Sequence, residues 1–450
     1  MVARPPARNL SFPFDPTYPM GRTVSGGLVH RIDEPFREDG APLATEAAQP
    51  ASGGISFVDE RQPDDTSVAQ GCRLEVRRTE RASFTEYHIT GIVDGPCDAL
   101  LAARTLLQRV AETIAEHGVQ PLQEKLYGLS SLRDAVLRCR TDVFRHHEIE
   151  VGMPATWIQG VPLRGCDFVG IQVWGIVAHG GWTSVSPVGD DQLGRGRLWT
   201  GRGFRMLHIP FVRGTRPDGT LLDGDSGQAE QMFLNANAVL KAHGFHYGQV
   251  KRTWIYVRRL LEWYDELNRV RTAFYRNEGL DMGGGLAFPA STGIQCSCDG
   301  EEIMMDVLAF DTEGPDCASA TPITTSARQH QSFKYGSAFS RGMIFEIEGR
   351  KTVHISGTAS INSAGASIHV GDAELQSLET LMCIAAILEE QGGSLESITS
   401  ATLFCKDRAA YEAWERVSRL LRIPAIPKIC VLADVCRHDL LVEMEAVATI

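Results

Sequence analysis

The sequence predicts an α+β protein that is built from three tandem copies of one unit. The first observation is a set of three short strings, YHITG, LHIPF and VHISG, each rich in residues that favour β-strands. Each string has a His–Ile pair at its centre, and the three histidines are His88, His208 and His354. The second observation is that similar elements follow each string in the same order. Such self-similarity is the sequence signature of a repeat.

Each string is followed by a Gly-containing turn and an amphipathic helix that ends at Gly118, Gly244 or Gly392. Glycine suits the left-handed cap at the end of a helix. A second strand (LQEKLYGL, VKRTWIYV, ITSATLFC), a second helix, a Pro–Ala string (MPATWIQG, FPASTGIQ, IPAIPKIC) and a hydrophobic closing strand follow. Alternating strands and helices arise by chance in many chains, but three ordered coincidences in each copy favour a true repeat.

This order of elements resembles the YjgF/Rid family, whose members are homotrimers with clefts between subunits. The resemblance implies three YjgF/Rid-like (chorismate-mutase-like) units that form an intramolecular pseudo-trimer. We expect repeats at residues 71–180, 195–312 and 333–450, with linkers between them. Residues 1–70 are rich in Pro, Gly and acidic side chains, which predicts a partly disordered N-terminal arm.

Bulk composition limits the class of partner. The 450 residues carry a net charge of −12, which disfavours nucleic acid or an anionic membrane as the main partner. The eleven cysteines include no CxxC pair, so we expect neither structural zinc nor a disulfide framework. The longest apolar stretch, which begins at Phe168, is too short to span a bilayer. We therefore expect a cytoplasmic protein.

The three closing strands differ in one chemically important way. The third contains Glu443 and Glu445 in an apolar run, whereas alignment by eye places Met304 and Ile171 opposite Glu443 in the other two. One carboxyl group among three equivalent places predicts a single working cleft. Burial would raise the pKa of Glu443 and suit it to donate a proton. The alternative is an ordinary amphipathic strand, because Glu443 and Glu445 share one face and would then be solvated.

The region from Phe288 to the last residue resembles the chorismatase family. Four strings carry the resemblance in order: PASTGI, ARQHQSFKYGSAFSRG, ISGTASI with SIHVGD, and DVCRHDLLVE. Simple Rid proteins instead carry a Pro–x–Arg string whose arginine binds an imino acid. The matching places here are Thr156, Ser291 and Ile426, which argues against ordinary imine deaminase activity. This chain carries an extra N-terminal unit compared with chorismatases, which leaves its substrate open.

Chorismatases cleave the enolpyruvyl ether of chorismate to pyruvate plus a hydroxybenzoate or a dihydroxycyclohexadiene carboxylate, without a metal or another cofactor. The resemblance implies that Glu443 donates the proton and that Arg341 clamps a carboxylate of the substrate. The other candidate substrate-binding residues are Ser291, Thr292, Gly293, Arg328, Lys334, Tyr335, Ala359, His369, Cys436 and Arg437. Each has a plain structural alternative, such as a surface arginine, a turn or a small buried cysteine. By the same resemblance, Cys436 implies a hydroxybenzoate product and Ala359 implies hydrolysis, so the product stays open.

Two other functions remain open. A related Rid-fold biosynthetic enzyme could act on a different carboxylated or imine/enamine intermediate. A non-catalytic ligand-binding protein could use the same clefts. For all three hypotheses we expect a small anionic ligand, no nucleic acid, no membrane, no metal, and a monomer or weak homodimer.

Overall fold

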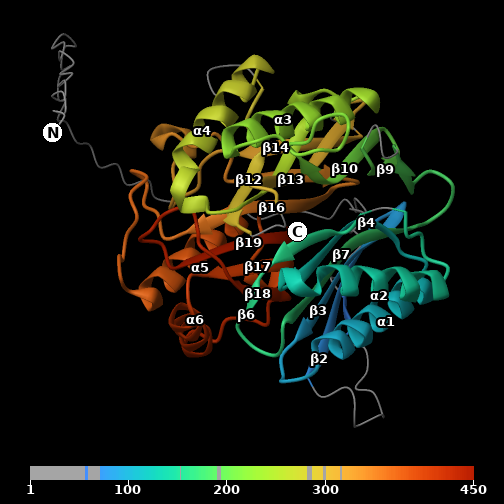
Figure 1. Ribbon diagram of the computed structural model, residues 1–450, viewed down its shortest axis with the longest axis horizontal. Helices are drawn as coiled ribbons and strands as arrows, with labels where there is room; N and C mark the ends of the chain where they lie inside the picture. Colours follow the sequence, from blue (N-terminus) through green and yellow to red (C-terminus); the bar gives the residue numbers. More distant parts are fainter. Residues whose placement is uncertain are drawn as a thin grey trace, which may run out of the picture. The chain divides into compact units, whose positions relative to one another are not determined.

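The computed structural model describes residues 56–58, 71–152, 154–189, 194–280, 286–296, 300–314 and 317–450. Except for 56–58, the predicted N-terminal arm lies outside the described residues. The α+β class is confirmed, because the described part of the chain forms three β-sheets and six α-helices (Figure 1). None of these helices combines the length and the apolar character needed to cross a membrane.

The first unit consists of a six-stranded sheet and two helices. Its strand order is β1-β2-β3-β7-β4-β5. The strands are β1 (Ser56–Val58), β2 (Cys72–Glu80), β3 (Phe84–Val93), β4 (Gln120–Gly128), β5 (Thr156–Gln159) and β7 (Phe168–Ala178). The helices are α1 (Ala99–His117) and α2 (Arg133–His146). The short strand β6 (Val161–Pro162) leaves this sheet and pairs with the third one.

The second unit repeats this plan. Its strand order is β12-β11-β13-β10-β9-β8. The strands are β8 (Ser184–Val188), β9 (Gly196–Gly201), β10 (Phe204–Arg213), β11 (Val250–Val257), β12 (Ala290–Gln295) and β13 (Ile303–Thr312). The helices are α3 (Asp225–Ala242) and α4 (Leu260–Asn277). Helices α3 and α4 contribute apolar side chains to one core with this sheet, so they cover one of its faces.

The third unit has the strand order β14-β15-β16-β19-β17-β18, and β6 is added at its end. The strands are β14 (Ala318–Ile323), β15 (Gly342–Ile347), β16 (Arg350–Ala359), β17 (Ile398–Cys405), β18 (Lys428–Leu432) and β19 (Val442–Thr449). The helices are α5 (Ala373–Glu389) and α6 (Arg408–Leu420). Short 3-10 turns lie at Ser130–Leu132, Tyr247–Gln249, Ser332–Tyr335 and Leu395–Ser397.

The three units share one strand order around their closing strands. In each, the strand that carries the His–Ile pair is antiparallel to the closing strand, which is antiparallel to the next strand. The three predicted cap glycines adopt positive φ angles of 67° at Gly118, 74° at Gly244 and 90° at Gly392. The predicted linkers contain strands, since β8 and β14 fall within them. The repeat boundaries stay a prediction.

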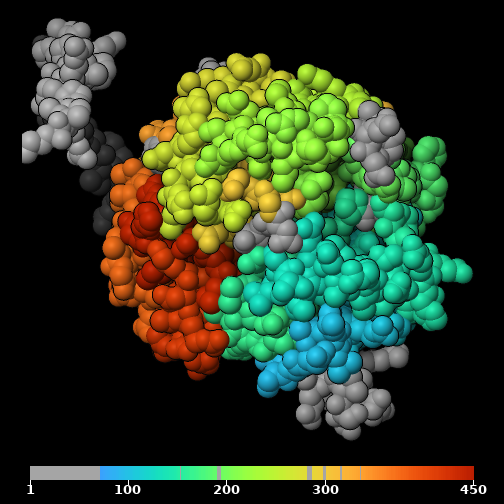
Figure 2. Space-filling view, in the orientation of Figure 1, coloured from blue at the N-terminus to red at the C-terminus, as the bar shows by residue number. Residues whose placement is uncertain are grey.

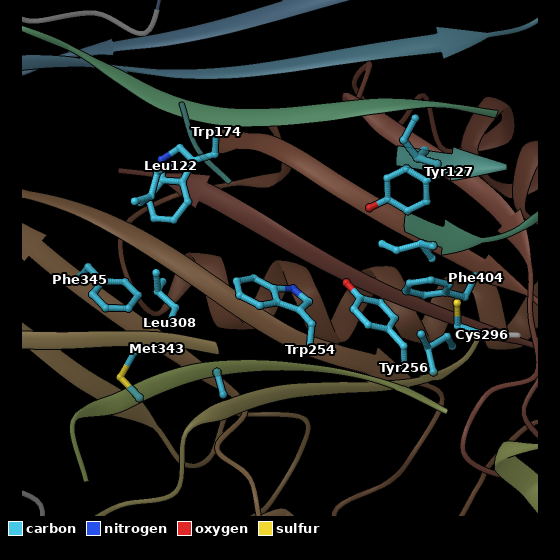
Figure 3. Close-up of a cluster of buried hydrophobic side chains, with 14 of the residues drawn as sticks. Leu122, Tyr127, Trp174, Trp254, Tyr256, Cys296, Leu308, Met343, Phe345 and Phe404 are labelled. Carbon is cyan, nitrogen blue, oxygen red and sulfur yellow. The ribbon is translucent and has the colours of Figure 1, made fainter. Parts of the chain in front are cut away.

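The units meet at one hydrophobic core. Each has its own core between sheet and helices, and a fourth cluster draws large side chains from all three sheets. Figure 3 shows Trp174, Trp254 and Phe345, one from each unit, within this shared cluster. Each sheet is thus covered by helices on one face and by the other units on the second face. The intramolecular pseudo-trimer is our interpretation of this arrangement.

Candidate active site

Glu443 lies on β19, in the interior of the third sheet. Its neighbours Val442 and Met444 join the core beneath the helices, so strand alternation turns Glu443 and Glu445 to the opposite face. The solvated alternative is wrong, because Glu443 is only 4% exposed and Glu445 only 6%. Both carboxyl groups are therefore held where the third unit meets the others.

Strand register identifies the places that correspond to Glu443. His354 is paired with Val447, His208 with Leu308, and His88 with Trp174. Four residues earlier on these closing strands stand Glu443, Met304 and Gly170. The alignment of Ile171 with Glu443 was therefore wrong by one residue. The conclusion drawn from it is unchanged, since one of the three equivalent places carries a carboxyl group.

The two carboxyl groups of β19 have opposite pKa shifts. Burial and the negative charge of Glu445 raise the pKa of Glu443 to about 8, against a smaller lowering by Arg252. Burial also disfavours the charged form of Glu445, but Lys125 and Arg252 outweigh it and lower the pKa of this carboxyl. Arg252 Nη2 lies 2.8 Å and Lys125 Nζ 3.4 Å from the carboxylate oxygens of Glu445. Glu443 is therefore a protonated acid beside an ionised carboxylate at neutral pH.

Gly357 leaves room for the Glu443 carboxyl group. It lies in a bulge of β16, between Ile355 and Thr358, where the register with β19 shifts. A Cβ atom at this position would stand 2.0 Å from Glu443 Oε1. The Gly357 N–H donates to Thr292 Oγ1 at 3.0 Å, which holds the bulge against β12 of the second unit. A larger residue here would displace the carboxyl group, because the acid approaches the backbone so closely.

Glu443 borders a hollow between the second and third units. The hollow is narrow, about 40 Å³, and adjoins a wider one of about 510 Å³. Both are lined by Tyr264, Ser337, Cys436 and Arg437, which makes them neighbouring parts of one cleft. Of the residues predicted from the sequence, the structure brings together Ser291, Gly293, Arg341, Ala359, Cys436, Arg437 and Glu443 around the narrow part.

The predicted clamp, Arg341, is a buried cation of this hollow. It is 2% exposed, and its Nε and Nη2 groups donate to the carbonyl oxygen of His330 at 3.0 and 2.8 Å. Its guanidinium carbon stands 5.4 Å from the centre of the Phe339 ring. These contacts fix the orientation of the guanidinium group before any ligand binds.

Other predicted residues lie elsewhere. Alternation along β12 sends Ser291 and Gly293 to the hollow and turns Thr292 away, so that its Oγ1 accepts from Arg252 Nη2 at 2.6 Å. Arg328 does not line the hollow but pairs with Glu379 of α5 at 2.6 Å. Lys334 and His369 are exposed and do not line it either. The side chain of Tyr335 lies outside the described ones.

Helix α4 supplies two lining residues that sequence reasoning missed. Burial and the neighbouring Cys436 raise the pKa of Tyr264 to about 12, so the phenol is neutral. Arg271 is 3% exposed, donates from Nη2 to Asn268 at 2.5 Å, and has a buried Nε without a hydrogen-bond partner in the described structure. Tyr264, Asn268 and Arg271 follow helical spacing. That polar stripe within an amphipathic helix was the available signal.

The family follows from comparison with known proteins. The sequence pattern of the family described as Endoribonuclease L-PSP matches residues 336–450. The 3-aminoacrylate deaminase RutC of Acinetobacter baylyi is 33% identical over 97 residues, which are 21% of this chain and 77% of that protein. The chain therefore belongs to the L-PSP/YjgF (Rid) family.

Solved structures with a similar fold include a chorismatase and a YjgF protein. A chorismatase structure is similar over 73% of this chain and 92% of its own length, with a TM-score of 0.52 and 18% identity. The YjgF gene product of E. coli covers 29% of this chain with 89% of its own length, at a TM-score of 0.22 and 18% identity. The chorismatase likeness is one of fold, and it extends over most of the chain.

Proposed function

We propose that this protein is a chorismatase-like enzyme that cleaves the enolpyruvyl ether of chorismate, with Glu443 as the proton donor. The observation that carries the proposal is the buried Glu443 carboxyl group, whose pKa of about 8 keeps it protonated at neutral pH beside a cation-lined hollow. The fold shared with a chorismatase supports the same assignment.

The chemistry requires one positioned acid. Glu443 donates its proton to the methylene carbon of the enol ether, which leaves an oxocarbenium ion on the substrate and a carboxylate on the enzyme. Water or a neighbouring substrate hydroxyl adds to this cation and loses a proton. Breakdown of the resulting hemiketal (from water) or cyclic ketal (from the hydroxyl) releases pyruvate and the ring product. A proton from solvent then restores Glu443, so that the step needs no cofactor.

Cations of the hollow match a dianionic substrate. Arg341 and Arg271 are buried and Arg437 is partly buried, and all three line the narrow part. We assign Arg341 and Arg271 to the two carboxylates, since a guanidinium group binds a carboxylate with paired hydrogen bonds. The substrate would extend into the wider part of the cleft, past Tyr264 and Arg437.

Two residues of the same hollow, Cys436 and Ala359, are candidates for selecting the product. Burial and the nearby Glu443 raise the pKa of the Cys436 thiol to about 12, so this side chain shapes the space as a neutral group and not as a thiolate. Ala359 also lines this hollow, on the strand that pairs with β19. The identity of the product is therefore left to the assay.

Incubation of the purified protein with chorismate, followed by assay of pyruvate and chromatography of the ring product, tests the proposal. We expect pyruvate from the wild type and none from Glu443→Gln, which removes the proton and keeps the shape. Glu374→Gln is the matched control, because Glu374 lies at the surface on α5 in a pair with Arg416. A folded wild-type protein that releases no pyruvate would refute the assignment.

One finding favours a second candidate. The relative RutC is a 3-aminoacrylate deaminase, which favours an imine or enamine substrate as the second candidate for this chain. Release of ammonia from 3-aminoacrylate, without release of pyruvate from chorismate, would select this alternative. Neither product, together with a thermal shift on addition of chorismate, would select a ligand-binding role.

A further inference from the structure

A second cleft lies one unit earlier, between the first and second units. It is a hollow of about 880 Å³ lined by residues of α2, β10 and α3 and of the segment that leads into β5. The hollow at Glu443 is lined by the matching elements one unit later, namely α4, β12 and β16. The place of Glu443 is taken by Met304, so this second cleft keeps the architecture of the first and lacks its acid.

Arginine side chains gather around this hollow. Among the lining residues that the structure describes, Asp218 is the one acidic residue. The arginines among them are Arg133, Arg140, Arg195, Arg213 and Arg216. Arg140 is buried in a pair with Glu124 and serves the fold. Arg213 pairs with Glu301 at 3.0 Å and Arg216 with Asp223 at 3.8 Å, and the side chains of the two arginines are still 37% and 45% exposed, so a ligand can reach them. Such a gathering on a chain with a net charge of −12 favours a negatively charged occupant.

Phe211 organises two of these arginines. It stands in the bulge of β10 that corresponds to the bulge of Gly357, and its φ angle is 56°. Its N–H donates to Asp306 Oδ1 at 2.8 Å. The guanidinium carbons of Arg133 and Arg213 lie 5.2 and 5.0 Å from the centre of its ring. A left-handed phenylalanine costs free energy where glycine would not, and such strain is typical of functional sites.

Trp157 adds an unsatisfied donor. Its side chain is 3% exposed and belongs to the lining of the hollow. The indole N–H is buried and has no hydrogen-bond partner within the described part of the chain. A buried donor without a partner destabilises the folded chain, and an indole that turned toward a ligand oxygen in the hollow would gain the partner that it lacks.

We propose that this hollow is a second binding site, for small organic carboxylates with a flat apolar body. The guanidinium groups beside Phe211 would bind the carboxylate, while Trp157 and Leu137 would contact the flat body. The absence of an acid at Met304 makes this a site of binding without turnover. The inference does not depend on the substrate of the Glu443 cleft, so the two proposals fail separately.

Crystals of the full chain soaked in 4-bromobenzoate, with bromine located by anomalous scattering, test the site together with titration calorimetry of the same probe. We expect bromine density beside Phe211 and measurable heat in solution. Phe211→Gly should stay folded, because glycine suits the backbone there, and should bind the probe at least tenfold more weakly. Arg133→Gln should weaken binding in the same direction.

The control is Glu443→Gln, which should bind the probe in this hollow as the wild type does. Bromine in the Glu443 cleft alone, or in neither cleft, would overturn the proposal. Density without heat would mean binding at crystal concentration only and would also count against it. Unchanged affinity in both Phe211→Gly and Arg133→Gln, with circular dichroism showing folded protein, would do the same.

Discussion

At the residue scale, Glu443 and Glu445 share one strand face and are held in different protonation states by their surroundings. The negative charge of Glu445 is compensated by Arg252 and Lys125. Glu443 instead borders a hollow and lies near the negative charge of Glu445. The same residue type thereby serves as an acid in one place and as a fixed anion two residues later.

The first prediction at this scale concerns the pH dependence of turnover. In the proposed mechanism Glu443 acts in its protonated form. Since its pKa is about 8, we expect the rate to be constant at neutral pH and to fall above about pH 8. The measurement is the pH profile of kcat/KM for pyruvate release. A rate that already falls between pH 4 and 5, as for an ordinary carboxyl group, would contradict the assignment.

Stability gives an independent readout of the same carboxyl group. The pKa of Glu443 is raised from 4.5 to about 8 on folding, so its contribution is fully present below pH 4.5 and is lost as the pH rises to about 8. Glu443→Gln has no proton to lose. We expect the variant to gain stability relative to the wild type across this pH range, as measured by urea denaturation. A constant difference would show that Glu443 titrates normally.

Gly357 allows a steric test. In Gly357→Ala the new methyl group would meet Glu443 Oε1 at 2.0 Å, so the acid must move. We expect activity to fall at least a hundredfold, with a smaller loss of thermal stability. Gly181→Ala is the control, since a Cβ there has nothing within 4 Å. Full activity in Gly357→Ala would place the reacting carboxyl elsewhere.

At the scale of elements, β4, β11 and β19 come from three different units and meet at one charged cluster. Lys125 is on β4, Arg252 on β11 and Glu445 on β19, and all three are buried. Removal of one partner from such a cluster costs about 3–5 kcal/mol, because a charge is left without compensation. The cluster thus links the units and sets the electrostatic field at Glu443.

Substitutions in this cluster should move the pH profile in opposite directions. Arg252 lowers the pKa of Glu443 and Glu445 raises it. We expect Arg252→Met to shift the alkaline limb of the rate profile to higher pH and Glu445→Gln to shift it to lower pH, by measurable fractions of a unit or more. Shifts in the same direction would show that the variants act through altered folding alone.

The sequence predicted the elements better than the geometry of the site. Hydrophobic periodicity and glycine caps located the six helices and the closing strands, because these signals are local. The short strands β6, β8 and β14 escaped, since pairing with distant strands creates them. Strand alternation could have separated Ser291 from Thr292. The proximity of Arg271 to Glu443 depends on the packing of two units, which a single sequence does not reveal.

At the scale of the whole molecule, the shared core couples the three units. Trp174 and Trp199 of the first and second units and Phe345 of the third belong to one buried cluster. Each unit also contacts the other two through its strands, and they adjoin one another on the surface in Figure 2. A unit that unfolded alone would expose the apolar inner faces of both neighbours to water.

This coupling predicts a single cooperative unfolding transition. Tryptophan fluorescence, which reports on the shared core, and far-ultraviolet circular dichroism, which reports on all helices, should give coincident thermal curves. Leu308→Ala removes apolar contacts within the shared core and should lower the midpoint of both curves together. Two separate transitions would mean that the units fold independently.

The two-residue strand β6 has a consequence for the solubility of shortened forms. It belongs to the first unit in sequence and pairs with Val431 and Leu432 at the outer strand of the third sheet. A chain that began after residue 162 would leave that backbone edge open, with unpaired N–H and C=O groups that can recruit a strand from another molecule. In the full chain the first unit therefore covers this edge and protects the third sheet from aggregation, whatever its clefts bind.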